Sequence, residues 1–216
     1  MTAKSFKYWK TQDLHEQFNL VKLESTEKLN NWLSAQNDIS EEERIQIQIL
    51  KDKLIKNANY WNEEELKIKF IGPFLELVNL DGENYKLFYN RSISASIDNI
   101  KVSGTVDMVV ASGFQKPKKP FFCIHERNAA RYKQELKKDS SDPVGQLLSE
   151  MIVAQKINGD GQVIYGSYVI GRSWYFVILE DNKYTVSDTY VATQDDIYTI
   201  FKILREVKKY IELIVK

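Results

Sequence analysis

Asp107 and Glu126 are carboxylates placed inside two apolar, β-branched runs of the sequence. The segment SGTVDMVVASGFQKPKKPFFCIHERN, from Ser103 to Asn128, contains both runs and a basic, proline-containing loop between them. An ionised side chain in an apolar run is costly to bury unless another group compensates its charge. If the two runs are neighbouring strands, the carboxylates lie side by side and repel each other unless a cation sits between them. A hard divalent ion such as Mg²⁺, held by carboxylates, waters and phosphate oxygens, is the expected compensation.

The elements around these carboxylates predict a mixed α/β fold with helices packed over a central sheet. Asp98-Asn99 suits a tight turn between the first two strands, and Pro73 is expected to kink or divide the first helix. The three-strand meander disfavours a purely parallel nucleotide-binding sheet, and the sequence has no Gly-rich phosphate loop. The predicted order is a helix over 62–78, strands over 84–97, 100–112 and 120–126, a helix over 143–158, strands over 162–171 and 174–180, and a helix over 195–215.

Residues 1–60 are polar, with apolar positions at helical spacing, and predict a helical extension packed on an α/β domain formed by residues 61–216. Ser40 followed by Glu43 is a capping-box arrangement that marks the start of one of these helices. The apolar stripes of the extension are too narrow to close a core of their own.

The order and spacing of the motifs resemble the PD-(D/E)XK nuclease superfamily. The run GTVDMVV and the run CIHERN, with Glu126 nineteen residues after Asp107, lie between a glutamate-bearing helix and a glutamine-bearing helix. The resemblance covers residues 62–171, about half of the chain, and the flanks are similar to those of small bacterial single-domain members. It implies a restriction-endonuclease-like α-β-β-β-α-β core and metal-dependent hydrolysis of DNA phosphodiester bonds.

The same resemblance assigns roles to individual carboxylates. It implies that Asp107 and Glu126 are catalytic residues that bind Mg²⁺, or Mn²⁺ in its place. Members of the superfamily often add a glutamate from the helix before the strands, and Glu63 fits that metal-ligand position best. Glu64 and Glu65 remain open for the same role.

The helix after the motif and the position two residues beyond Glu126 complete the implied site. Gln146 resembles the glutamine that many members carry on this helix, and Glu150 lies one turn further on the same face. The catalytic lysine of the family is here Asn128, which can orient a water but carries no charge. Two alternatives stay open: Arg131 or Lys133, just beyond the strand, supplies a cation in its place, or Asn128 itself orients the water.

A basic segment around the carboxylates predicts a phosphate-binding strip, for which Lys118, Lys119, Arg131 and Lys133 are the candidate nucleic-acid contacts. The formal net charge is zero, which argues against a protein that coats nucleic acid with its whole surface. DNA is therefore the expected partner, through a local surface.

The composition places the chain in a reducing compartment. Cys123 is the single cysteine, so no internal disulfide forms, and the N-terminus lacks the apolar core of a signal peptide. No apolar run approaches the roughly 18 residues of a membrane helix. These features predict a cytoplasmic protein without membrane contact, and they leave a homodimer open.

Three classes of function stay open from the sequence. The first is a metal-dependent nuclease, impaired or not by Asn128. The second is a catalytically degenerate nuclease fold that binds nucleic acid or a partner protein. The third is an interaction or structural protein in which the basic strip meets an acidic protein partner.

Overall fold

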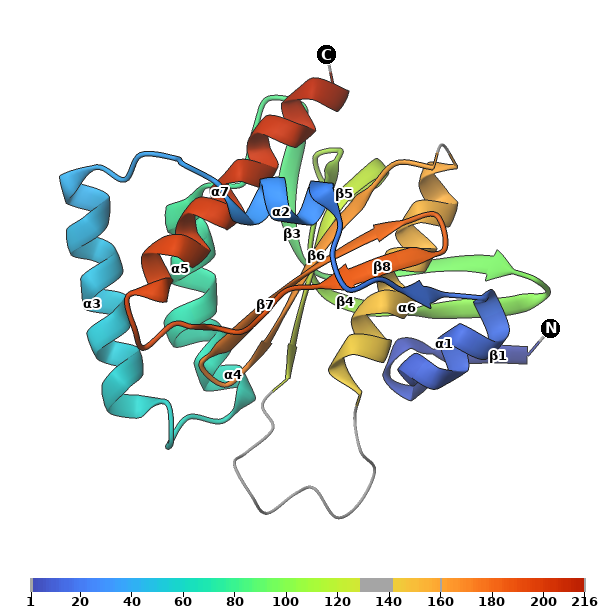
Figure 1. The fold of residues 1–216 in the computed structure, drawn as a ribbon, viewed down its shortest axis with the longest axis horizontal. Helices are drawn as coiled ribbons and strands as arrows, with labels where there is room; N and C mark the ends of the chain where they lie inside the picture. Colours follow the sequence, from blue (N-terminus) through green and yellow to red (C-terminus); the bar gives the residue numbers. More distant parts are fainter. Residues whose placement is uncertain (1, 129–141, 160, 216) are drawn as a thin grey trace.

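A mixed sheet of nine strands runs through the described part of the chain, with helices on both of its faces (Figure 1). The computed structural model describes residues 2–128, 142–159 and 161–215, and it leaves the side chains of residue 2 and of residues 123–128 outside that description. The strands are β1 (Thr2–Ser5), β2 (Val21–Lys22), β3 (Tyr85–Ile97), β4 (Ile100–Ser112), β5 (Lys118–Asn128), β6 (Ile164–Ile170), β7 (Ser173–Glu180), β8 (Lys183–Val186) and β9 (Tyr190–Val191).

The centre of the sheet is an antiparallel meander followed by a helical crossover. The strand order is β1-β4-β5-β6-β7-β8-β2, with β3 paired to β4 and β9 paired to β7. β4 is antiparallel to both β3 and β5, and β5 is parallel to β6 across the intervening helix α6. The expected mixed sheet flanked by helices is thus confirmed, and its central elements follow the order α-β-β-β-α-β.

The helices begin and end close to their predicted limits. Ser40 and Glu43 form the predicted capping box at the start of α3, and Gly159 ends α6 in the left-handed conformation. The helices are η1 (Phe6–Tyr8), α1 (Thr11–Phe18), α2 (Glu27–Leu33), α3 (Glu41–Asn57), α4 (Glu63–Leu66), η2 (Lys67–Ile71), α5 (Gly72–Val78), α6 (Pro143–Asn158) and α7 (Asp196–Ile214).

The predicted helix over residues 62–78 is divided by a π-helical turn, η2, between α4 and α5. Pro73 has no N–H group, and its ring crowds the carbonyl four residues earlier. The Gly72 amide donates to the Lys67 carbonyl five residues back, so the turn before the proline is wide. Single π-helical turns of this kind often occur at functional sites.

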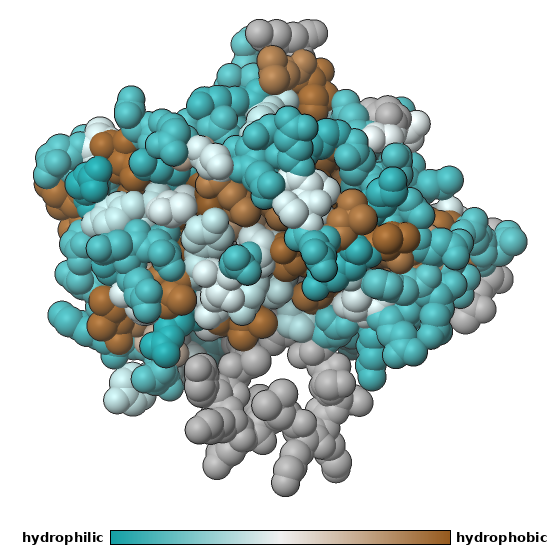
Figure 2. Space-filling view, viewed as in Figure 1, coloured by the Kyte–Doolittle hydropathy of each residue, from teal (hydrophilic) through white to brown (hydrophobic). Residues whose placement is uncertain are grey.

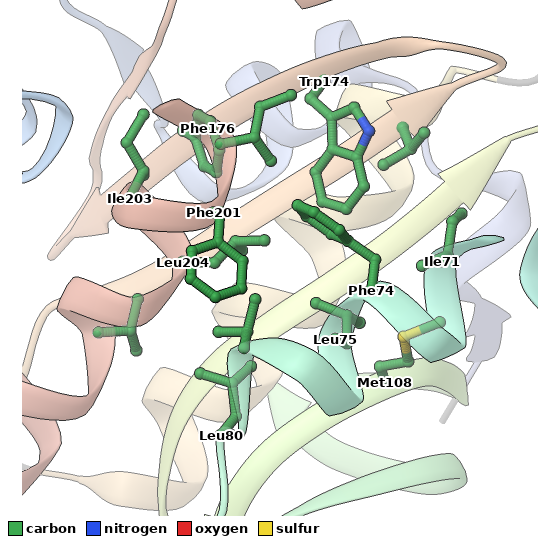
Figure 3. Close-up of a cluster of buried hydrophobic side chains, with 14 of the residues drawn as sticks. Ile71, Phe74, Leu75, Leu80, Met108, Trp174, Phe176, Phe201, Ile203 and Leu204 are labelled. Carbon is green, nitrogen blue, oxygen red and sulfur yellow. The ribbon is translucent and has the colours of Figure 1, made fainter. Parts of the chain in front are cut away.

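The first hydrophobic core lies between the sheet and helices α2, α3, α5 and α7 (Figure 3). Phe74 of α5 is its centre, with ring centroids 5.8 Å from Trp174 of β7 and 5.9 Å from Phe201 of α7. Trp32 of α2 is fully buried, and its indole N–H donates to the Ile203 carbonyl at 2.7 Å. These contacts fix α5, and with it η2, against one face of the sheet.

The second core lies on the other face, between the sheet, α6 and the N-terminal elements η1 and α1. Phe6, Leu14, Val109, Leu147 and Met151 are among its buried side chains. The central strands are covered on both faces, which explains the continuous apolar run at the end of β4.

Residues 1–60 contribute to both cores, and they contain two short strands that their sequence does not predict. β1 pairs in parallel with β4, and β2 pairs in parallel with β8. The expectation of helices alone over this segment is wrong in this respect. Strands of four and two residues are too short to show an alternating pattern, and the edges of the sheet select their conformation.

The surface of the described residues is mainly hydrophilic, with scattered apolar patches over α3 and over the C-terminal end of α7 (Figure 2). Ile45, Ile49 and Ile55 of α3 and Leu213 of α7 are exposed. Across residues 2–128, 142–159 and 161–215, none of the helices combines the length and the apolar character needed to cross a lipid bilayer.

Candidate functional site

In both β3 and β4, the alternation of side chains between the two faces of the sheet is interrupted, at Asn90 and at Asp107. Val106 and Val109 both pack into the second core, although residues three apart on a regular strand point to opposite faces. β3 shows the same break, and the antiparallel register places Asn90 opposite Asp107. Asn90 has a φ of 51°, a left-handed conformation that asparagine tolerates better than most residues. The break releases Asp107 from the regular alternation of its strand.

Lys67 is the cation beside Asp107. Its ammonium group donates to Asn90 Oδ1 at 2.9 Å and lies 3.9 Å from Asp107 Oδ1. Only 9% of the lysine is exposed, so the charge is largely removed from bulk water. A buried lysine is retained at a carboxylate because each charge compensates the other. Lys67 is the first residue of η2, and the wide π-helical turn therefore sets where the ammonium group enters.

The three candidate glutamates lie on the helix that precedes Lys67. Glu65 accepts from the Asn62 amide as part of the α4 capping box, and it pairs with Lys69 at 2.7 Å. These contacts hold the pKa of the Glu65 carboxyl below its usual value, Lys69 being the largest cause. Glu63 lies four residues before Lys67, on the same side of the helix, and Glu64 lies three residues before it. Lys67 is the residue of this helix that reaches Asp107, and the choice among Glu63, Glu64 and Glu65 as the helix ligand stays a prediction.

The backbone of β5 brings Glu126 to the same place in the sheet. Met108 pairs with His125 in the antiparallel ladder, and continuing this register by one residue places Glu126 opposite Asp107. The side chains of Glu126 and Asn128 lie outside the described residues. The predicted neighbouring strands are confirmed, and the convergence of the two carboxylates stays a prediction.

Gln146 lies in the first turn of α6, on the face of the sheet opposite to α4 and α5. Its amide donates to Glu150 Oε1 at 3.4 Å, one turn along the helix, and Glu150 is fully buried. The start of α6 is fixed by Asp142, which accepts from the Gly145 amide and, at 2.7 Å, from the Thr11 amide at the start of α1.

The same end of α6 lies near the strand neighbour of Glu126. Tyr168 of β6 pairs with Glu126 in the parallel register. Burial raises the pKa of the Tyr168 hydroxyl, and the charge of Asp142 adds to that shift. Gln146 follows Asp142 by one helical turn, and the hydrogen bond of its side chain connects it to Glu150 rather than to Lys67 or Asp107.

The predicted phosphate-binding lysines lie apart from this cluster. Lys118 and Lys119 are exposed at the first residues of β5, and Lys118 pairs with Ser112 of β4. Glu126 is eight residues further along the strand than Lys118, about 26 Å at the rise of a β-strand. The structure does not bring Lys118 and Lys119 to the carboxylates. Arg131 and Lys133 lie outside the described residues.

Among the described side chains, no group of three or more His, Cys, Asp and Glu residues could hold a metal ion. Asp107 is the one member of the predicted pair whose side chain is described, and the paired residues of β4 and β5 end at Met108 and His125, one residue short of Asp107 and Glu126. Carboxylate oxygens suit a hard divalent cation, so the donor type fits Mg²⁺ while Lys67 already balances one of the charges.

Lys67 is the functional candidate that the sequence analysis missed. Lys67 stands one helical turn after Glu63 in the run EEELKIKF. Lysines that follow glutamates by three or four residues are also typical of a solvated helix face, so the run does not mark Lys67 as buried. The one available indication was the nearby Pro73, which predicts an irregular turn. That indication does not say which lysine turns inward.

No family model matches this chain, and no curated protein sequence matches it.

Proposed function

We propose that this protein is a metal-dependent nuclease with a restriction-endonuclease-like core that hydrolyses DNA phosphodiester bonds. The α-β-β-β-α-β order of its central elements supports this proposal. So does the pairing of β4 with β5, the adjacent strands that carry Asp107 and Glu126.

The single observation that carries the proposal is the position of Lys67. The family resemblance implies a lysine at position 128, where this chain has Asn128. Lys67 brings an ammonium group to within 3.9 Å of Asp107 from the preceding helix instead. A fixed cation in a partly dehydrated site stabilises negative charge that develops on a phosphate in the transition state. Lys67 thus supplies, next to Asp107, the positive charge that Asn128 lacks.

In this proposal the remaining residues bind the metal ion or hold other side chains in position. Asp107 and Glu126, with Glu63 as a further ligand, would hold Mg²⁺ or Mn²⁺, which would polarise the scissile phosphate and lower the pKa of a bound water. Lys67 holds Asp107, and Asn90 holds Lys67. Gln146 orients Glu150 on α6.

One observation favours a second candidate, a nuclease-like fold that binds nucleic acid without cutting it. Lys67 provides a positive charge 3.9 Å from Asp107 Oδ1, so Asp107 does not require a metal ion for burial. In this candidate the Lys67–Asp107 pair is structural, and Asn128 marks the loss of the catalytic lysine.

The experiment is cleavage of supercoiled and linear DNA by the purified protein with Mg²⁺ or Mn²⁺. Asp107→Asn and Lys67→Met should each lower the cleavage rate by about 10² or more, the usual effect of removing one charged group that acts in the transition state. Lys69→Met is the matched control, because Lys69 lies in the same π-helical turn and pairs with Glu65 instead. It should cleave at the wild-type rate.

Asn128→Lys separates the two candidates further. If Lys67 already serves the site, a second cation two residues from Glu126 should leave the rate unchanged or lower it. If the site is degenerate, Asn128→Lys should raise a low rate. The nuclease proposal fails if neither the wild type nor Asn128→Lys cuts DNA while Asp107→Asn still binds it.

A further inference from the structure

Beyond Asn90 and Asp107, β3 and β4 continue as an arm, residues 91–106, with the tight turn Asp98-Asn99 at its tip and with β1 paired to β4 along residues 100–103 (Figure 1). One face of the arm is covered. Ile93 and Val102 are buried in the second core, and Phe6 lies so close to Gly104 that a Cβ atom there would approach its ring to 2.5 Å. The arm is thereby fixed on the body of the protein, and its other face points outward.

The outward face is a ladder of hydroxyl and amine groups. Three cross-strand pairs follow each other toward the tip, and all six side chains are exposed or half-buried: Ser92 with Thr105, Ser94 with Ser103, and Ser96 with Lys101. Ser92 Oγ and Thr105 Oγ1 are 3.2 Å apart. These six positions carry one positive charge, no carboxylate and no aromatic ring.

This ladder leads to the candidate site. Asn90 and Asp107 stand two residues beyond Ser92 and Thr105 along their strands, at the point where the alternation breaks and Lys67 enters from η2. The positive charges of Lys101 at one end and Lys67 at the other lie on the same side of the sheet. A polyanion bound along the arm would therefore be directed to Asp107.

The chemistry of the ladder matches a nucleic-acid backbone. Serine, threonine and lysine side chains are common donors to phosphate oxygens, and such contacts position a nucleic acid without reading its sequence. Proteins that hold single strands stack the bases on aromatic side chains, and the six outward positions of the arm have none. Short side chains also allow a rigid duplex to approach the strands closely.

We propose that the outward face of the arm is the docking surface for duplex DNA on one side of the cleaved bond. This inference deepens the proposed nuclease function and rests on it. Lys101 is six residues from Asp107, about 20 Å along a strand. At 3.4 Å per base pair the arm spans about six base pairs.

The test measures binding and cleavage separately. Binding of a fluorescent duplex of about twenty base pairs is followed by anisotropy in EDTA, where no metal-dependent cleavage occurs. Lys101→Ala should weaken binding by about tenfold, and it should lower the slope of log K against log salt by about one. The double variant Ser94→Glu/Ser103→Glu should weaken binding more strongly, because it places two carboxylates against phosphates. Lys53→Ala, at an exposed position of α3, is the matched control and should bind as the wild type.

The outcomes distinguish this inference from the nuclease proposal. Wild-type binding by Lys101→Ala overturns the docking surface, and it does so even if Ser94→Glu/Ser103→Glu fails to fold. Equal binding of an RNA duplex or of a single strand overturns the choice of duplex DNA. If the wild type cleaves DNA and the arm variants bind it as well as the wild type does, the nuclease proposal is supported and the docking surface is rejected. If the arm variants bind DNA more weakly and no protein cleaves it, the docking surface is supported and the protein binds nucleic acid without cutting it.

With an active nuclease, the arm also sets a length requirement. A duplex that extends only two base pairs beyond the cleaved bond on the arm side should be cut at least tenfold more slowly than a duplex that extends eight base pairs on that side. Lys101→Ala should remove most of this difference, while Lys53→Ala should retain it.

Discussion

Lys67 and Asp107 form the interaction on which the candidate site depends, and a double-mutant cycle measures it. The ammonium group is 3.9 Å from Asp107 Oδ1, and the two side chains are 11% and 17% exposed. At an effective dielectric constant of about 20, two unit charges at this distance attract each other by about 4 kcal/mol. Desolvation and the remaining exposure offset part of that attraction. We therefore expect a coupling free energy of about 2 kcal/mol.

The single variants give the expected magnitudes. Lys67→Met keeps the length of the side chain but loses the coupling and the hydrogen bond to Asn90, which contributes about 1 kcal/mol. It should lower the free energy of unfolding by about 3 kcal/mol. Asp107→Asn leaves Lys67 without its charge partner and should cost about 2 kcal/mol. The double variant should be less destabilised than the sum of the two.

Urea unfolding at neutral pH, followed by far-UV circular dichroism, provides the four free energies. Lys69→Met is the control, because its ion pair with Glu65 is largely exposed and such pairs contribute less than about 1 kcal/mol. If the effects of Lys67→Met and Asp107→Asn add to within about 0.5 kcal/mol, the two groups are not coupled. The proposed role of Lys67 would then lose its physical basis.

Three further predictions concern the rest of the fold. Arg205 donates two hydrogen bonds to Glu43 and is the main cause of the lowered pKa of that carboxyl, so the pair stabilises the fold above the unfolded pKa and this contribution is lost as the pH falls through the folded one. Glu43→Gln should therefore cost about 1 kcal/mol in unfolding free energy at pH 7 and almost nothing near pH 3. Gly145→Ala should lower the melting temperature, although alanine favours helices, because its Cβ would lie 2.6 Å from the Trp9 carbonyl oxygen; an unchanged or raised melting temperature would contradict this close approach of α6. Phe74→Ala should cost about 3–5 kcal/mol in urea unfolding, since the ring is fully buried between α7 and the sheet, and a loss below 1 kcal/mol would mean that the core closes around the gap.

The sequence by itself determined the elements of the central domain and the position of Asp107 within it. Period-two alternation, the Asp98-Asn99 turn, the Ser40 capping box and Pro73 are local features, and their conformations depend on residues close in the chain. The neighbouring strands of Asp107 and Glu126 could also be predicted, because consecutive strands joined by a short loop pair with each other. These predictions required no knowledge of distant contacts.

Tertiary structure alone decided that Lys67 meets Asp107. Lys67 and Lys69 have the same local context in the sequence, and only the packing of α5 against Trp174 and Phe201 turns one inward and leaves the other with Glu65. The strands β1 and β2 exist only because an edge of the sheet pairs with them. Lys118, close to Glu126 in the sequence, lies far from it because a strand extends by about 3.3 Å per residue. Proximity along the chain predicts contacts within an element, whereas the site is assembled from contacts between elements.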